Sequence, residues 1–130
     1  LARERSWKGA EPMKRLLEQL NTTPGVIGSM VMTDDGIPVV SLLGTEMDEE
    51  CVAAFSSTVQ LAANRTAAQL DNQHPDEVII EADQGNLLLI HLDGALLAEM
   101  THAGLELNTG LLEIRSVARR LREILTIRTP

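Results

Sequence analysis

Three kinds of residue in this sequence could do chemistry: an acidic triplet, a few histidines and one cysteine. Asp34-Asp35-Gly36 stands between two apolar runs and could be either a ligand site or the turn of a hairpin. A calcium loop of the EF-hand type would need further oxygen ligands at alternate positions. The next four residues are Ile, Pro, Val and Val, which offer no side-chain oxygen. Asp-Gly between apolar runs is a strong hairpin signal, so we predict a turn.

The histidines and the cysteine lack the spacing of a metal site or of a catalytic group. His91 lies in an apolar run, His102 follows another, and Cys51 is distant from both in sequence. Acidic residues at 48–50 adjoin Cys51, and such a setting raises the pKa of a thiol and disfavours a nucleophile. His74-Pro75-Asp76 spells the tripeptide of J-domain co-chaperones, which lies between two helices, whereas a β-branched run follows it here.

The chain also lacks other signatures of an enzyme. No Gly-rich loop precedes a Lys-Ser or Lys-Thr pair, so a nucleotide-binding P-loop is not expected. Catalysis needs an acid, a base or a nucleophile that converge, and the sequence suggests no such group. We therefore predict a protein that is not an enzyme, with no catalytic residues, no cofactor and no metal.

Composition and charge narrow the class of protein. The 130 residues are 44% hydrophobic and are long enough for one domain with a sizeable core. A single cysteine, no apolar run long enough to span a membrane and no apolar signal segment at the start predict a cytoplasmic protein without membrane insertion.

Charge is unevenly distributed along the chain, whose net charge is −8. Residues 1–15 carry +3 and residues 115–130 carry +4, whereas the segment between them carries −15. The basic ends are expected either to pair locally, to form a patch for a partner, or to be solvated helix faces. One Trp and one Phe, with no broad basic face, argue against binding to nucleic acid.

Hydrophobic periodicity predicts three helices and five strands. The helices are expected at 11–20, 48–70 and 107–125, and the strands at 26–33, 37–43, 77–83, 86–92 and 95–101. Pro38 cannot donate to a ladder, so its strand should lie at a sheet edge or keep Pro38 on an unpaired side. The run from Leu87 to Ile90 is apolar throughout and should be central, whereas the shorter strand at 77–83 resembles an edge.

The middle helix is the most informative segment, because residues 51–70 contain one charge, Arg65. One stripe of larger residues should face the sheet: Val52, Phe55, Val59, Ala62, Thr66 and Leu70. A second stripe is mostly small: Ala54, Ser57, Leu61, Asn64 and Ala68. A helix that is apolar or small nearly all round is usually buried on more than one side, so we predict that the second stripe meets another copy of the chain.

The element order predicts an α/β sandwich. A hairpin and a three-stranded meander form a five-stranded, mainly antiparallel sheet, with the terminal helices on one face and the middle helix on the other.

This pattern resembles the Roadblock / dynein light-chain family, and within it the MglB-like proteins. The segments that carry the resemblance are "PGVIGSMVMTDDGIPVVS", the charge-poor helix, "EVIIEADQGNLLLIHLDGALLAEMT" and "LNTGLLEIRSVARRL". The resemblance implies a profilin-like fold with strand order 2-1-5-4-3, over a domain at 11–127 after a polar extension at 1–10. It also implies dimers that pair the third strands and the middle helices. The residues on which this falls are Ala54, Ser57, Leu61, Asn64, Ala68, Val78 and Ile80.

The function that the resemblance implies is noncatalytic regulation of a Ras-like small GTPase, as a GTPase-activating partner. We expect the acidic side chains at the start of the middle helix to meet basic groups of the GTPase: Asp48, Glu49 and Glu50. One alternative is a ligand-sensing module of PAS or GAF type, which would need an internal pocket. Another is an assembly scaffold of the dynein light-chain type, which would leave GTP hydrolysis unchanged.

Overall fold

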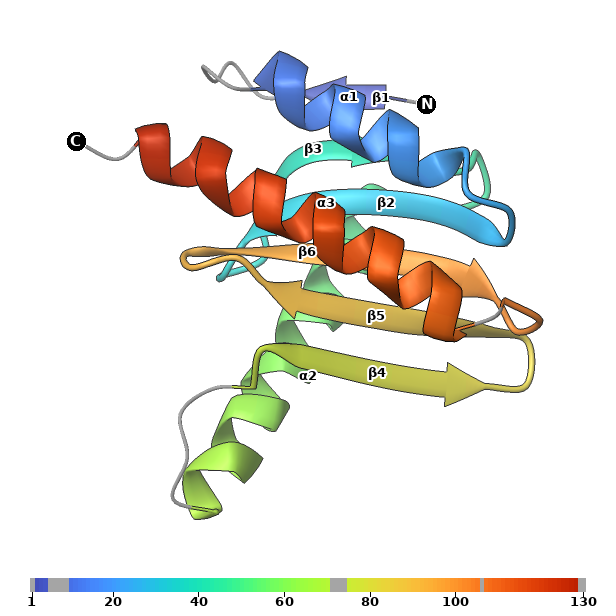
Figure 1. Ribbon diagram of the computed structural model, residues 1–130. Helices are drawn as coiled ribbons and strands as arrows, with labels where there is room; N and C mark the ends of the chain where they lie inside the picture. The colour runs from blue at the N-terminus through green and yellow to red at the C-terminus, as the bar shows by residue number, and fades with distance from the viewer. Residues whose placement is uncertain (1, 5–9, 71–74, 106, 129–130) are drawn as a thin grey trace.

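The computed structural model describes residues 2–4, 10–70, 75–105 and 107–128 of the chain (Figure 1). The elements in chain order are β1 (Ala2–Glu4), α1 (Ala10–Asn21), β2 (Val26–Thr33), β3 (Pro38–Leu42), α2 (Glu49–Gln69), β4 (Glu77–Ala82), β5 (Gly85–His91), β6 (Ala95–His102) and α3 (Leu107–Arg128). All three predicted helices and all five predicted strands are present, with boundaries that differ by a few residues.

The strands form one antiparallel sheet in the order β1-β3-β2-β6-β5-β4. The predicted order of the five main strands is therefore confirmed, with β4 at one edge and β5 inside the sheet. The short strand β1 is an addition, since it lies within the segment predicted as a polar extension. It pairs with β3 from Ala2↔Leu42 to Glu4↔Val40, so β3 is not an edge strand, which was the first of the two positions predicted for the strand of Pro38. Pro38 itself aligns with Met32 of β2 and lies beyond the end of the β1 register.

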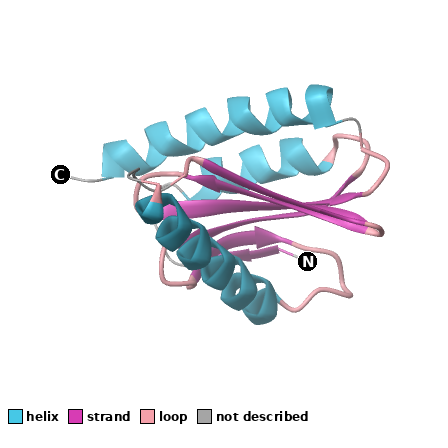
Figure 2. Cartoon of the chain, turned by 90° about the horizontal axis from the view of Figure 1, so that it is seen from below, coloured by secondary structure: helices cyan, strands magenta, loops and turns pink. Residues whose placement is uncertain are grey.

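The helices cover the sheet on both faces, as predicted. Figure 2 shows α1 and α3 together on one side of the strands and α2 crossing the other side. Alternate residues of each strand enter the two cores. On β2, Val31 belongs to the cluster under α1 and α3, whereas Met30 and Met32 belong to the cluster under α2.

The acidic triplet forms the turn between β2 and β3, which confirms the hairpin. Gly36 has a φ of +89°, a conformation that glycine adopts at little cost. Its backbone N–H donates to the Thr33 carbonyl oxygen at 2.9 Å, and the Thr33 N–H donates to the carbonyl oxygen of Ile37 at 2.8 Å. The turn also reaches α2, because a Cβ added at Gly36 would lie 2.9 Å from the hydroxyl oxygen of Ser57.

The face that α2 presents to the sheet differs from the predicted one. Its buried residues are Val52, Ala53, Ser56 and Gln60. Of the stripe predicted to face the sheet, only Val52 is buried, whereas Phe55 and Leu70 are exposed. A helix that is apolar or small on most sides gives little periodicity from which to choose a face. The prediction chose the stripe with the larger side chains, and that stripe lies to one side of the face that contacts the sheet.

Candidate partner-binding surface

The second half of α2 extends beyond the sheet. In Figure 1 the last turns of this helix lie past β4, outside the edge of the sheet. None of the residues from 61 to 69 is buried, yet only one of their side chains is charged. An exposed helical surface with so little charge is unusual in a monomer and marks a region where another protein can bind.

Strand β4 continues this surface along the sheet edge. Val78 packs against the α2-side core, and Ile80, two residues further on, lies on the same face and keeps 41% of its surface exposed. Ile79 points to the opposite face and is 38% exposed. The outer edge of β4 is not paired with any described strand, and an unpaired apolar edge is a template for pairing with a second chain.

The two predicted stripes of α2 lie on opposite flanks of the helix. Ser57 faces the β2–β3 turn, as its contact with Gly36 shows. Phe55 is about 160° away from Ser57 around the helix and lies on the other flank. Val59, on the flank of Phe55, packs on the same core cluster as Val78 of β4. The flank of Phe55 is therefore the one that is continuous with the exposed face of β4.

The residues predicted for a dimer interface are accessible to different degrees. Ala54, Leu61, Ala68 and Ile80 are exposed, and Ser57, Asn64 and Val78 are partly buried. Asn64 also accepts a hydrogen bond at 2.9 Å from the side chain of Gln60. The prediction from sequence omitted Phe55 and Leu70, which are 45% and 69% exposed, because it assigned both residues to the sheet-facing stripe.

The three acidic residues at the start of α2 differ in their surroundings. Asp48 is the N-cap, and its carboxylate accepts from the backbone N–H of Glu50 at 2.9 Å and of Cys51 at 3.4 Å. Such a cap satisfies donors that a helix leaves free at its first turn. Glu49 is partly buried and accepts a hydrogen bond from the hydroxyl of Ser41 on β3. Glu50 is exposed, so it is the best placed of the three to meet a partner.

The surroundings of Cys51 match the prediction from sequence. The charge of Asp48 is the main cause that raises the pKa of the exposed Cys51 thiol, and a hydrogen bond with Asp48 acts in the same direction. A raised pKa reduces the thiolate fraction near neutral pH and disfavours nucleophilic chemistry.

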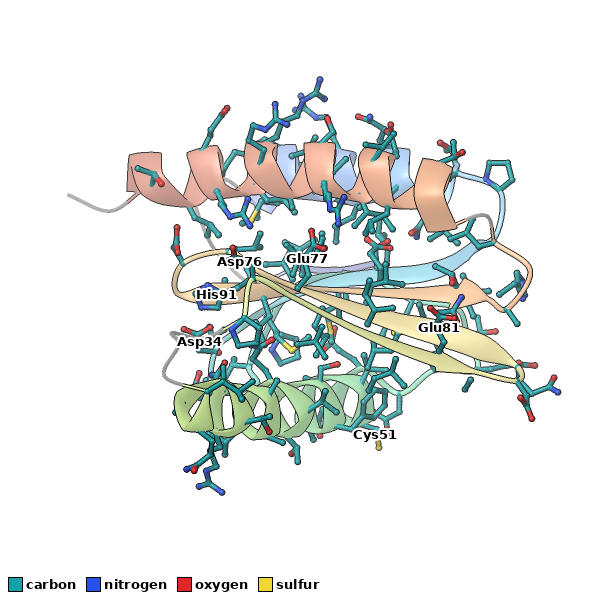
Figure 3. The ribbon with its side chains drawn as sticks, turned by 60° about the horizontal axis from the view of Figure 1, so that its bottom comes forward. Asp34, Cys51, Asp76, Glu77, Glu81 and His91 are labelled. Atoms are coloured by element: carbon teal, nitrogen blue, oxygen red, sulfur yellow. The ribbon has the colours of Figure 1, made fainter. Side chains whose placement is uncertain are left out.

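The histidine on β5 joins two turns. The His91 side chain is 12% exposed, with Nε2 3.8 Å from Oδ1 of Asp34 and Nδ1 3.7 Å from Oδ1 of Asp93. Figure 3 shows Asp34 beside His91 at the end of the sheet where these turns meet. Across the residues that the structure describes, no group of three or more His, Cys, Asp or Glu side chains is arranged to hold a metal ion. The tripeptide at 74–76 is followed at once by β4, and its His74 lies outside the described residues.

Two basic residues of the C-terminal segment bind neighbouring groups of the sheet. Arg115 on α3 binds the carboxylate of Glu77 on β4 through Nε at 2.5 Å and Nη2 at 2.7 Å. This hydrogen bonding is the main cause that lowers the pKa of Glu77. Arg122 donates to the backbone carbonyl oxygen of His91, with Nη2 at 2.7 Å. These two arginines fasten α3 to the sheet, which supports local pairing for part of the basic C-terminal segment.

Sequence comparison identifies the family. The profile of the Roadblock/LC7 domain matches residues 13–100. This chain belongs to the Roadblock/LC7 family. Three relatives in Methanocaldococcus jannaschii, the uncharacterized proteins MJ0310, MJ1340 and MJ0714, are 35–36% identical to this Roadblock/LC7 chain over 100 residues. The alignments cover 77% of the chain and 83–86% of each relative.

Solved structures share the fold of this Roadblock/LC7 chain at lower identity. MglB from Myxococcus xanthus superposes with a TM-score of 0.86 at 12% identity, over 92% of this chain and 98% of that protein. An MglB with a tetrameric arrangement superposes with a TM-score of 0.83 at 15% identity, over 93% of both chains. For a Roadblock/LC7 domain from Streptomyces avermitilis the TM-score is 0.79 at 18% identity, over 87% of this chain and 97% of that domain. None of the described helices is both long and apolar enough to cross a membrane.

Proposed function

We propose that this protein is a noncatalytic homodimeric regulator of a Ras-like small GTPase and acts in the cytoplasm as a GTPase-activating partner. Residues 11–127 form its single domain in this proposal, and β1 from the preceding segment adds a strand to its sheet. The GTPase as partner comes from the resemblance to MglB-like proteins. The observation that supports the proposal best is the exposed apolar surface that α2 and β4 share at the open edge of the sheet.

A second copy of the chain accounts for that surface. On each copy, the surface consists of Phe55, Val59, Leu70, Val78 and Ile80. Pairing of two β4 edges would extend the sheet, and the overhanging half of each α2 would then pack beside the α2 of the other copy. Ala62, a small residue on the flank of Phe55 in that half, would let the two helices approach closely. A two-fold arrangement uses the same surface on both copies and leaves no open edge at β4.

Acidic groups near α2 give the GTPase a surface of opposite charge to bind. Glu50 is exposed at the start of the helix, and Asp34 and Asp35 are exposed in the turn that touches its middle. The net charge of −8 would attract a basic surface and increase the rate of encounter at low salt. Glu49 is a weaker candidate, because its carboxylate is committed to Ser41.

The interior favours this proposal over a ligand-sensing module. The two faces of the sheet are filled by aliphatic side chains, including Met30, Met32, Leu88 and Leu97, which are all but inaccessible to solvent. A hollow of about 750 Å³ between the α1–β2 loop and the start of α3 is open to the surface. It lacks the enclosure that a PAS or GAF pocket would need to bury a small molecule.

GTP hydrolysis tests the proposal. A Ras-like GTPase from the same organism is assayed with and without the chain, and we expect faster turnover in its presence. Binding without faster turnover would support the scaffold alternative, and the absence of binding would contradict the proposal.

Two matched charge reversals test the acidic surface. Glu50→Lys should weaken GTPase binding by about two- to tenfold at low salt, the range of an exposed interfacial charge. Glu18→Lys is the control, because Glu18 is also exposed but lies on α1, on the other side of the sheet. Equal affinities of the two variants would remove Glu50 from the interface.

A further inference from the structure

A carboxyl group is buried inside the sheet without a charged partner. Glu99 on β6 is 0% exposed and lies on the side covered by α1 and α3, two residues after Leu97 of that core. It pairs in register with Ser29 of β2, and its Oε2 lies 2.7 Å from the Ser29 hydroxyl oxygen. Its other oxygen, Oε1, is buried without a hydrogen-bond partner.

The hydrogen bonds around Ser29 fix where the protons lie. Asn21, the last residue of α1, donates from Nδ2 to the backbone carbonyl oxygen of Leu42 at 3.0 Å. Its Oδ1 therefore faces the Ser29 hydroxyl, at 2.5 Å. Oδ1 can only accept, so the single hydroxyl hydrogen of Ser29 is used on Asn21. The contact between Ser29 and Glu99 then needs a hydrogen on Glu99, because two oxygens without one would only repel.

Among the described side chains, none is placed to stabilise a charged Glu99 carboxylate by forming an ion pair with it. The titratable side chains that the structure describes on the elements flanking or covering Glu99 are Glu11, Lys14, Arg15 and Glu18 of α1, His91 of β5, His102 of β6, and Glu113, Arg115, Arg119, Arg120, Arg122 and Glu123 of α3. None of them forms a hydrogen bond or an ion pair with Glu99. Several bind elsewhere: Arg115 binds Glu77, Arg122 binds the backbone of His91, and Glu113 accepts from Gln19.

We infer that Glu99 is a neutral carboxylic acid that donates to Ser29, and that its proton controls how firmly the end of α1 is fastened to the sheet. The polar chain is Glu99, Ser29 and Asn21, and it ends at the carbonyl oxygen of Leu42. When Glu99 gives up its proton to solvent, the Ser29 hydroxyl must turn to the new carboxylate. Asn21 Oδ1 then loses its donor, and the last turn of α1 loses one of its attachments to β2.

The electrostatics of the site agree with this proton count. Burial is the main cause that raises the pKa of Glu99 well above the ordinary value. The folded protein therefore keeps a proton that the unfolded chain has released. This contribution to stability is complete below the unfolded pKa and is lost as the pH rises through the folded pKa. Between those values, the folding equilibrium constant falls about tenfold for each pH unit.

The unaltered protein gives the first test. The side-chain carboxyl carbon of Glu99 is followed by NMR from about pH 4 to about pH 9. We expect Glu99 to keep the chemical shift of a protonated acid at pH values well above those at which the exposed glutamates titrate. Titration of Glu99 together with the exposed glutamates would overturn the inference. This test does not involve a partner, so its outcome is independent of the proposed function.

Glu99→Gln gives the second test, because the amide keeps a donor for Ser29 and cannot ionise. In the unaltered protein the unfolding midpoint should fall as the pH rises, and in Glu99→Gln this fall should be absent. Amide hydrogen exchange at residues 17–21 should also stay slow in the variant at pH values where protection falls in the unaltered protein. Glu77→Gln is the control, since the pKa of Glu77 is lowered and its contribution is lost at the acid end instead. The same pH dependence in Glu99→Gln and in the unaltered protein would overturn the inference.

Discussion

Ile80→Lys tests the proposed dimer where the sheet edge and the helix meet. Burying a whole isoleucine side chain contributes about 1.5–3 kcal/mol. Because 41% of Ile80 is still exposed in the single chain, covering it contributes about 1 kcal/mol for each copy. A two-fold interface counts this twice, about 2 kcal/mol, which corresponds to a dimer dissociation constant about 30-fold higher in the variant. A lysine on each copy adds a further penalty, since the charges must be desolvated or held apart.

The assay is sedimentation velocity over a dilution series, which gives the dissociation constant directly. Leu112→Lys is the matched control: Leu112 is 67% exposed, but it lies on α3, on the opposite side of the sheet. Circular dichroism of each variant verifies that the monomer remains folded. A dissociation constant for Ile80→Lys within about threefold of the control would mean that Ile80 is not buried between two copies, because a change that small corresponds to less than 1 kcal/mol.

Four further substitutions test other parts of the structure. Phe55→Lys should weaken the dimer more than Leu61→Lys in the same assay, because Phe55 lies on the flank that continues into β4; the reverse order would favour the stripe of small residues. Asp48→Ala should lower the free energy of unfolding by about 1 kcal/mol in chemical denaturation, because the N-cap is lost. It should also increase the rate at which a thiol reagent modifies Cys51 at neutral pH. An unchanged rate would show that Asp48 does not cause the raised pKa of Cys51. Gly85→Ala places a Cβ 2.7 Å from the backbone carbonyl oxygen of residue 101, and it should destabilise the fold by about 1–3 kcal/mol in urea, whereas an unchanged midpoint would contradict so close an approach.

The order of the main strands could be predicted because the signals are local. Asp34-Asp35-Gly36 and Asp93-Gly94 mark hairpins by turn chemistry alone, and positive φ values at Gly36, Asp93 and Gly94 confirm both turns. The unbroken apolar run from 87 to 90 identified an interior strand, since its side chains divide between the two cores. Strand β1 gave no such signal: three residues of mixed polarity become a strand only through pairing with β3, which is distant in sequence.

The candidate surface was harder to predict because it depends on which way α2 is turned. Ser56 and Gln60 are buried against the sheet, whereas Phe55 is exposed, so polarity alone points to the wrong face. Packing between the helix and the sheet decides this orientation. Glu99 is a similar case, because a glutamate in the run "ALLAEMT" suggests a solvent-facing position on an alternating strand. Only the cover provided by α1 and α3 makes it a buried acid.

In the proposed function, a pair of chains joined at β4 and α2 forms the surface that a Ras-like GTPase binds. The most direct measurement is calorimetric titration of such a GTPase into the unaltered protein and into Ile80→Lys at a concentration where only the former is dimeric. We expect binding to the dimer and a loss of at least about tenfold in affinity for the monomeric variant. Equal affinity for a protein shown to be monomeric in the same buffer would contradict it.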